Sequence, residues 1–192
     1  VDLVLRMMDS SADGAEAASG EEEPVTLKTW DFGGQREYYV MHHLFLTNRG
    51  IYLVITRLDA WLREGDLDGP SGADEDEAFE PPLEALTFWL SSIHVHAPDA
   101  IVVIVGTHAD MVAARRQEAE ARVEEEIVRL MERVPGVERQ VVINDAAGLC
   151  FFPVNNSAGA SEPGILALRA CIDREAATAM SAQGIFGQAL PL

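Results

Sequence analysis

Thr29-Trp30-Asp31-Phe32-Gly33-Gly34-Gln35 closes a strand-like segment that begins at Val25. Side chains along this segment alternate between two faces, which is the period of a β-strand. An Asp at the end of a strand can hold a divalent cation through water. A Gly pair lets the backbone N–H approach a phosphate, and a Gln beside it can hold a water. Together these features indicate a site for the γ-phosphate of a nucleotide; the alternative is an ordinary strand, turn and helix with a glycine-rich corner.

Two later apolar segments also end in polar loops that precede a helix pattern. Residues 101–105 form a continuous apolar run, as expected of a strand buried on both faces, and Gly106-Thr107-His108-Ala109-Asp110 follows. Residues 149–154 are followed in the same way by Asn155-Asn156-Ser157-Ala158-Gly159. These patterns predict an α/β fold, in which ligands bind at the carboxyl ends of the strands. A carboxylate such as Asp110 can accept hydrogen bonds there from the N1–H and the exocyclic amino group of guanine.

The remaining periodicity predicts further elements around these strands. Alternation at residues 1–8 predicts a strand that forms a hairpin with the Val25 segment, and the apolar run 51–55 predicts another buried strand. Helices are expected at 36–48, from Pro81 onward, at 111–134 and at 162–178, with a minor strand at 141–143. In the third of these helices, the spacing pairs Glu118 with Arg122 and Glu125 with Arg129. The run Glu124-Glu125-Glu126 is expected on its solvated face.

Composition restricts the function classes. A chain of 192 residues with 48% hydrophobic content fits one domain with a proper core. The net charge of −18 disfavours nucleic acids and anionic membranes as partners, and no apolar run is long enough to span a membrane. The acidity is concentrated in residues 9–23 and 64–80, which we expect to be solvated loops, with docking of a basic partner as the alternative. Cys150 and Cys171 are expected to be buried thiols in a reducing compartment.

The three strand ends, in this order and spacing, resemble the small GTPases of the Ras superfamily. The motif Trp30-Asp31-Phe32-Gly33-Gly34-Gln35, with the Tyr- and His-rich stretch 38–46, resembles the Roc (Ras of complex proteins) branch, and so does Thr107-His108-Ala109-Asp110. The resemblance covers residues 1–178. It implies a three-layer α/β sandwich of the P-loop NTPase type, with a mostly parallel sheet and one antiparallel hairpin at its edge.

The resemblance implies a role for each motif residue that faces the phosphates. Asp31 would anchor Mg²⁺ through water, and the Gly34 N–H would bond the γ-phosphate. Gln35 would orient the attacking water, which makes it the expected catalytic residue. The expected cofactors are therefore GTP or GDP with Mg²⁺.

The same resemblance assigns the guanine base to the two later loops. Asp110 would recognise guanine, with Thr107 and His108 in the places of the more usual Asn and Lys. The Ala158 N–H, which follows Ser157, would bond guanine O6 and reject adenine. The alternative for Asp110 is a simple N-cap of the following helix.

A phosphate-binding P-loop, which reads GxxxxGK[ST], is absent from the sequence. The one lysine, Lys28, lies within the Val25 strand. In the family, the strand that feeds the P-loop lies centrally, between the Val25 and Ile51 strands, so we expect it to be missing here, with a gap and two unpaired strand edges. We therefore expect a truncated chain that binds GTP and GDP poorly.

Two functional hypotheses follow. The first is a guanine-nucleotide switch with slow GTP hydrolysis inside a larger cytoplasmic Roc–COR (C-terminal of Roc) signalling protein. In such a protein, residues 179–192 would lead toward the COR domain, and the Roc–COR region would form a homodimer. The second hypothesis is a non-catalytic scaffold or dimerisation module with a degenerate nucleotide site. The sequence names neither an effector domain nor a pathway.

Overall fold

The computed structural model describes residues 2–8, 27–32, 42–62 and 81–183. Its strands are β1 (Asp2–Met8), β2 (Leu27–Phe32), β3 (Gly50–Arg57), β4 (Ile101–Thr107) and β5 (Phe152–Pro153). Its α-helices are α1 (Leu58–Trp61), α2 (Pro82–His96), α3 (Arg116–Arg133) and α4 (Pro163–Gln183). Short 3-10 turns are η2 (His42–Phe45), η3 (Ala113–Arg115), η4 (Val137–Arg139) and η5 (Asn156–Ala158). Gly34, Gln35, both acidic segments and residues 184–192 lie outside the described residues.

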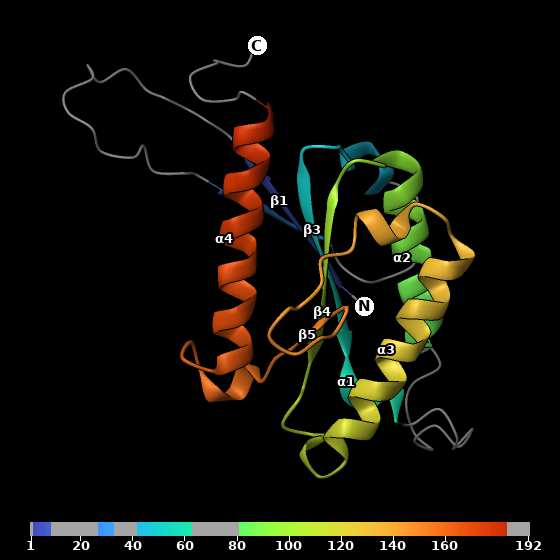
Figure 1. The fold of residues 1–192 in the computed structure, drawn as a ribbon, viewed down its shortest axis with the longest axis vertical. Coiled ribbons are helices and arrows are strands. Elements are labelled where there is room, and N and C mark those ends of the chain that lie inside the picture. Colours follow the sequence, from blue (N-terminus) through green and yellow to red (C-terminus); the bar gives the residue numbers. More distant parts are fainter. Residues whose placement is uncertain (1, 9–26, 33–41, 63–80, 184–192) are drawn as a thin grey trace, which may run out of the picture.

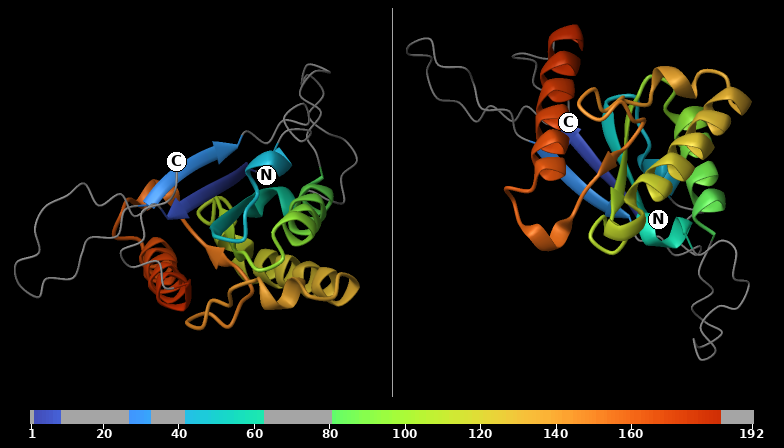
Figure 2. Two further views of the ribbon diagram at one scale, coloured as in Figure 1. Left: turned by 90° about the horizontal axis from the view of Figure 1, so that it is seen from above. Right: turned by 60° about the horizontal axis from the view of Figure 1, so that its bottom comes forward.

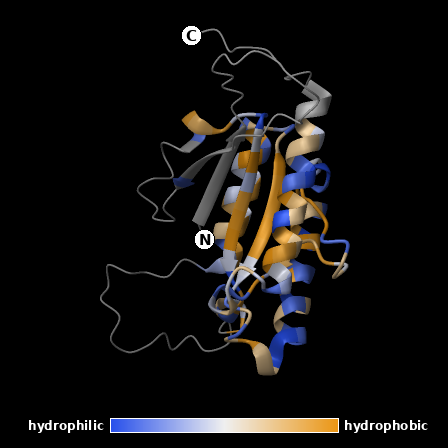
Figure 3. Ribbon diagram, turned by 90° about the vertical axis from the view of Figure 1, so that its left-hand side faces the viewer, coloured by the Kyte–Doolittle hydropathy of each residue, from blue (hydrophilic) through white to orange (hydrophobic). Residues whose placement is uncertain are grey.

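Three layers are built from the apolar strands that the sequence predicts. Helices α2 and α3 lie on one side of the sheet and α4 lies on the other (Figure 1). Along β3, Tyr52 and Val54 enter the core beneath α2 and α3, whereas Ile51 and Leu53 enter the core beneath α4. Because both faces are covered, β3 and β4 are hydrophobic along most of their length, while the helices carry both kinds of residue (Figure 3).

The strand order is β2-β1-β3-β4-β5. Strands β3, β4 and β5 are parallel, and β1 is antiparallel to both of its neighbours, β2 and β3. Strand β2 therefore runs in the same direction as β3, and the carboxyl ends of β2, β3, β4 and β5 share one edge of the sheet. Figure 2 shows the two N-terminal strands side by side, next to β3.

One expectation about the sheet is wrong for the described residues. The predicted hairpin of β1 and β2 forms, but no gap separates it from β3, because β1 pairs with β3 from Asp2 opposite Ile55 to Met7 opposite Gly50. The physical reason is that unpaired backbone N–H and C=O groups are costly when they are shielded from water. Strand β1 occupies the central place in which the sequence predicts a missing strand.

The helices agree with the sequence in type and differ at their ends. Helix α2 begins at Pro82 and ends at His96, and α3 begins at Arg116 rather than at residue 111. The apolar sides of these helices are buried at Leu86, Trp89, Leu90 and Ile93 in α2 and at Val123, Ile127 and Leu130 in α3. The predicted strand at 141–143 is reduced to one bridge between Val102 and Val141. Of the predicted helix 36–48, residues 42–48 are described, and they form the short turn η2 followed by non-helical residues rather than an α-helix.

Candidate functional site

The carboxyl edge of the sheet gathers the predicted site residues that the structure describes. Asp31 lies near the end of β2 and is exposed, and Thr107 ends β4 and is buried. Asp110 lies on the exposed loop after β4, and the exposed pair Ser157 and Ala158 lies in η5 after β5. The carboxyl edge therefore has an acidic side chain, Asp31, at β2 and two polar loops after β4 and β5.

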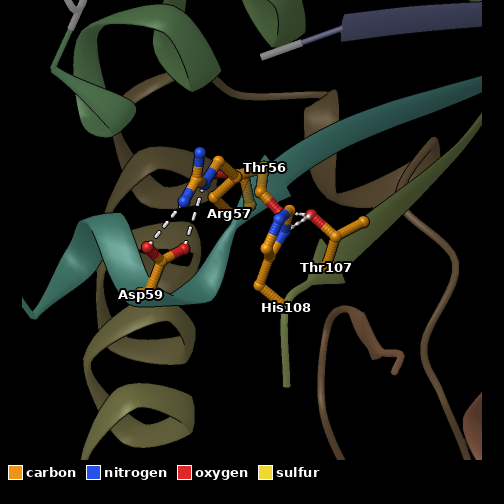
Figure 4. Close-up of polar contacts among 5 residues, drawn as sticks. All are labelled: Thr56, Arg57, Asp59, Thr107 and His108. Carbon is orange, nitrogen blue, oxygen red and sulfur yellow. Dashed lines mark hydrogen bonds and ion pairs between the residues drawn. The ribbon is translucent and has the colours of Figure 1, made fainter. Parts of the chain in front are cut away.

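The loop after β4 is held by two side-chain contacts (Figure 4). The Thr107 hydroxyl donates to the Thr56 carbonyl at 3.2 Å, and His108 Nδ1 lies 3.1 Å from Thr107 Oγ1. A carbonyl oxygen can only accept, so the single hydroxyl hydrogen of Thr107 is donated to the Thr56 carbonyl. In the contact between His108 Nδ1 and Thr107 Oγ1, the hydrogen therefore comes from Nδ1. In a neutral His108 ring, Nε2 is then a hydrogen-bond acceptor. His108 has φ 60°, the left-handed region that non-glycine residues seldom adopt.

Asp110 and Ser157 meet although 47 residues separate them. The Ser157 hydroxyl donates to Asp110 Oδ2 at 3.4 Å, and both residues are exposed. Two backbone bonds hold the loops in this position, since Val154 N donates to Gly106 O and Ala109 N donates to Val154 O.

The alternative role of Asp110 as a helix cap is wrong. Neither η3 nor α3 has a side-chain cap, and α3 begins only at Arg116. The Asp110 carboxylate faces Ser157 and solvent instead, so it remains accessible to a ligand.

The loop after β5 is shaped by Asn155. Its side-chain oxygen accepts a hydrogen bond from Ser157 N at 2.9 Å, and its carbonyl accepts one from Ala158 N at 3.3 Å. The Ala158 N–H, which the family resemblance assigns to guanine O6, therefore already has a long internal bond. A ligand carbonyl has to share or replace that bond.

Sequence reasoning missed an ion pair at the end of β3. Arg57 Nε donates to Asp59 Oδ1 at 3.1 Å, and Arg57 Nη2 donates to Asp59 Oδ2 at 2.8 Å. This hydrogen bonding raises the pKa of the Arg57 guanidinium above its usual value. Arg57 is opposite Thr107 in the parallel register, so the pair lies one strand away from the loop of Asp110 (Figure 4). The signal in the sequence was an arginine at the end of a strand whose preceding residues are apolar.

The fold and this edge define an α/β domain of the kind that binds ligands at the carboxyl ends of its parallel strands. A family model described as "Ras of Complex, Roc, domain of DAPkinase" matches residues 5–110, more than half of the chain. The chain belongs to the Roc family, and it is therefore a Ras-like α/β domain. Among the described residues, no helix combines the length and the apolar character needed to cross a membrane.

Several relatives of this chain are named as protein kinases. Leucine-rich repeat serine/threonine-protein kinase 1 of Caenorhabditis elegans is 36% identical over 102 residues, which make up 52% of this chain and 4% of that protein. The probable serine/threonine-protein kinase pats1 of Dictyostelium discoideum is 38% identical over 90 residues, 47% of this chain and 2% of that protein. The Mus musculus leucine-rich repeat serine/threonine-protein kinase 1 is 31% identical over 93 residues, which make up 48% of this chain and 4% of that protein. The chain thus spans a few per cent of the length of these relatives. No solved structure matches it significantly.

Proposed function

We propose that this domain binds guanine nucleotides at the carboxyl edge of its sheet and serves as a nucleotide-dependent switch within a larger protein. The observation that carries the proposal is the meeting of Asp110 and Ser157 on loops after β4 and β5, with an exposed carboxylate that caps no helix. Membership of the Roc family supports the same function.

The base is recognised by hydrogen bonds that guanine matches and adenine does not. The Asp110 carboxylate accepts from guanine N1–H and from the exocyclic amino group, which a carboxylate does in a bidentate manner. The Ala158 N–H donates to guanine O6 in place of its long bond to Asn155. Thr107 and His108 support the loop through the chain of contacts that begins at the Thr56 carbonyl.

The phosphates extend from the base toward β2. Strands β1 and β3 separate β2 from β4, so Asp31 lies three strand spacings from the guanine loop, about 14 Å. A nucleoside triphosphate with Mg²⁺ spans such a separation. In this arrangement Asp31 would hold Mg²⁺ through water. Gly34 and Gln35, which lie outside the described residues, would bond the γ-phosphate through the Gly34 N–H and orient water for slow GTP hydrolysis. Mg²⁺, when bound, neutralises phosphate charge.

The wider context is part of the same proposal. Residues 1–178 form the nucleotide-binding domain, and residues 179–192, which begin within the last turns of α4, lead toward a COR domain. The Roc–COR region forms a homodimer. The three relatives described above are named as kinases, and we propose a cytoplasmic signalling protein of that general kind.

Titration of the ¹⁵N-labelled chain with GDP and GTP in the presence of Mg²⁺ tests the proposal, with ATP as the comparison. We expect weak, guanine-selective binding, since the sequence contains no GxxxxGK[ST] motif to cradle phosphates. Amide signals of residues 107–110 and 155–158 should shift with GDP and not with ATP. Equal responses to GDP and ATP, or none, contradict the proposal.

Asp110→Asn tests the base contact directly. The NH₂ group of the introduced asparagine would face the N–H donors of guanine, and two donors cannot bond each other. The affinity for GDP should therefore fall by roughly tenfold or more. Xanthosine diphosphate carries an oxygen at that place on the base, and the variant should prefer it. Asp99→Asn is the matched control, because Asp99 is exposed and immediately precedes Ala100 and the amino end of β4, on the opposite edge. An unchanged preference in Asp110→Asn excludes this residue from base recognition.

A scaffold or dimerisation module is the second candidate, and the pairing of β1 favours it. Because β1 is hydrogen-bonded to β2 and β3, the described sheet is continuous without a phosphate-binding strand. A stable, monodisperse chain that binds no nucleotide at millimolar concentration supports this candidate.

A further inference from the structure

Arg57 is the cationic side chain at the carboxyl edge of the sheet among the described residues. The described residues at the carboxyl ends of β2, β3, β4 and β5 are 31–32, 56–59, 106–112 and 152–158, and among them Arg57 alone is a lysine or arginine. The same residues include the carboxylates of Asp31, Asp59 and Asp110. An anionic ligand at this edge therefore meets one positive charge among the described residues, and it lies at the end of β3 between the β2 end and the loop of Asp110.

The Arg57 guanidinium has an unused set of donors. A guanidinium carries five N–H groups, and Asp59 accepts from Nε and from one N–H of Nη2. The three other N–H groups, two on Nη1 and one on Nη2, have no hydrogen-bond partner among the described residues. They form a second planar fork of the kind that binds two oxygens of a phosphate.

The surroundings fix the direction of this fork. The Asp59 side chain is 7% exposed, whereas that of Arg57 is 42% exposed, so the carboxylate anchors the guanidinium from the buried side. The chain after Arg57 is held by Leu58 and Trp61, which are fully buried, and Trp61 Nε1 donates to Thr56 Oγ1 at 2.9 Å. An arginine held in this way loses little side-chain entropy when it binds an anion.

We propose that Arg57, oriented by Asp59, binds the phosphate groups of the nucleotide through its second pair of N–H donors. This inference rests on the proposed function, since it takes the nucleotide to lie with its base at Asp110. It assigns an anion-binding role to a residue of β3, outside the motifs at the ends of β2, β4 and β5.

The test compares ligands with and without phosphate by NMR titration. The probes are guanosine, GDP and inorganic pyrophosphate, each titrated into the wild-type chain, Arg57→Gln and Arg57→Lys. We expect Arg57→Gln to lower the affinity for GDP and for pyrophosphate by roughly tenfold and to leave the affinity for guanosine unchanged. Arg57→Lys should retain part of the affinity, because it keeps the charge and loses the fork. Arg49→Gln is the control, since it removes one exposed arginine just before the amino end of the same strand and should change no affinity by more than about twofold.

Removal of Arg57 alone takes the guanidinium away from the buried Asp59 carboxylate, so a second variant guards against loss of the fold. Arg57→Gln combined with Asp59→Asn replaces the ion pair by two amides that can bond each other, and it should show the same loss for GDP and pyrophosphate. Unchanged GDP and pyrophosphate binding in this folded double variant overturns the inference, as does an equal loss for guanosine. If the wild-type chain binds guanosine as tightly as GDP, the phosphates add no affinity. This result overturns the inference about Arg57 but leaves the proposed base site at Asp110 intact. Pyrophosphate binding that depends on Arg57, with no guanosine or GDP binding, supports the anion site and refutes the proposed nucleotide function.

Discussion

At the scale of single residues, Asp110 shows how a role depends on neighbours in space. Its place after a buried strand allows either a helix cap or a base contact. The structure separates these roles, because α3 begins at Arg116 without a side-chain cap and Ser157 donates to the Asp110 carboxylate. The contact between Ser157 and Asp110 exists because two loops meet in the fold, so neither loop's sequence predicts it alone.

The two cysteine thiols yield a prediction about pH. Burial raises the pKa of Cys150 from 9.0 to about 12 and that of Cys171 from 9.0 to about 11. The folded state therefore holds both protons more tightly than the unfolded state does. Below about pH 9 both states are protonated and the full stability is present, and above it unfolding releases protons, so the free energy of unfolding falls as pH rises toward 12.

Urea unfolding between pH 8 and pH 11 checks this dependence. Cys150→Ala and Cys171→Ala should lower the stability at pH 8 but flatten its decline above pH 9, compared with the wild type. A thiol reagent at pH 8 should modify the folded chain slowly and the urea-unfolded chain rapidly, because the thiolate is the reactive form. Rapid modification of the folded chain contradicts the burial of these thiols.

At the scale of elements, α3 differs from its predicted pattern on its charged side. Arg129 pairs with both Glu125 and Glu126, as the spacing predicts for Glu125. Glu118 hydrogen-bonds Arg115, and its predicted partner Arg122 acts on it electrostatically as a smaller contribution. Glu124 is not simply on the solvated face, since its Oε2 accepts from the Cys150 backbone N–H at 2.8 Å. That bond ties α3 to the segment that leads into β5 and its Ser157 loop.

Glu124→Ala should lower the free energy of unfolding by about 1–3 kcal/mol, because it leaves a backbone donor beside a buried residue without its charged acceptor. Glu125→Ala is the matched control, since the adjacent Glu125 is 61% exposed and its ion pair with Arg129 should contribute less than about 0.5 kcal/mol. Urea denaturation of the three chains measures both values, and urea avoids the ionic screening that guanidinium causes. Equal losses in the two variants contradict the role of Glu124.

At the scale of the whole molecule, the place of β1 decides whether the sheet is continuous. Hydrogen bonds to β2 on one side and β3 on the other use the backbone groups on both edges of β1. Strand β2 has one neighbour among the described strands and forms the outer edge. The N-terminal hairpin is therefore joined to the parallel part of the sheet by backbone bonds rather than by side chains alone.

Native-state hydrogen exchange tests this arrangement. Amides along β1 should be protected on both of its edges, while alternate amides of β2, which point away from β1, should exchange rapidly. Strong cross-strand contacts between the Hα atoms of facing residues in β1 and β3 should accompany this protection. Uniformly rapid exchange at residues 2–8, with unprotected amides on the β1-facing side of β3, contradicts the pairing.

The sequence by itself determined the buried strands β3 and β4, the apolar stripes of α2 and α3, and the polar loops that follow each parallel strand. These features depend on local periodicity and composition, because a strand covered on both faces must be apolar throughout and a helix must present one apolar side. The family membership follows from motifs that are also local.

Only the tertiary structure decided that β1 fills the place beside β3, that Ser157 reaches Asp110 and that Glu124 bonds the Cys150 backbone. It also showed that Arg57 turns toward Asp59, which leaves three guanidinium N–H groups without a hydrogen-bond partner among the described residues. Each of these depends on which strand ends lie side by side or on how a chain is held after a strand. Strand order is set by the pairing of backbone groups far apart in sequence, and local periodicity carries no information about those pairs.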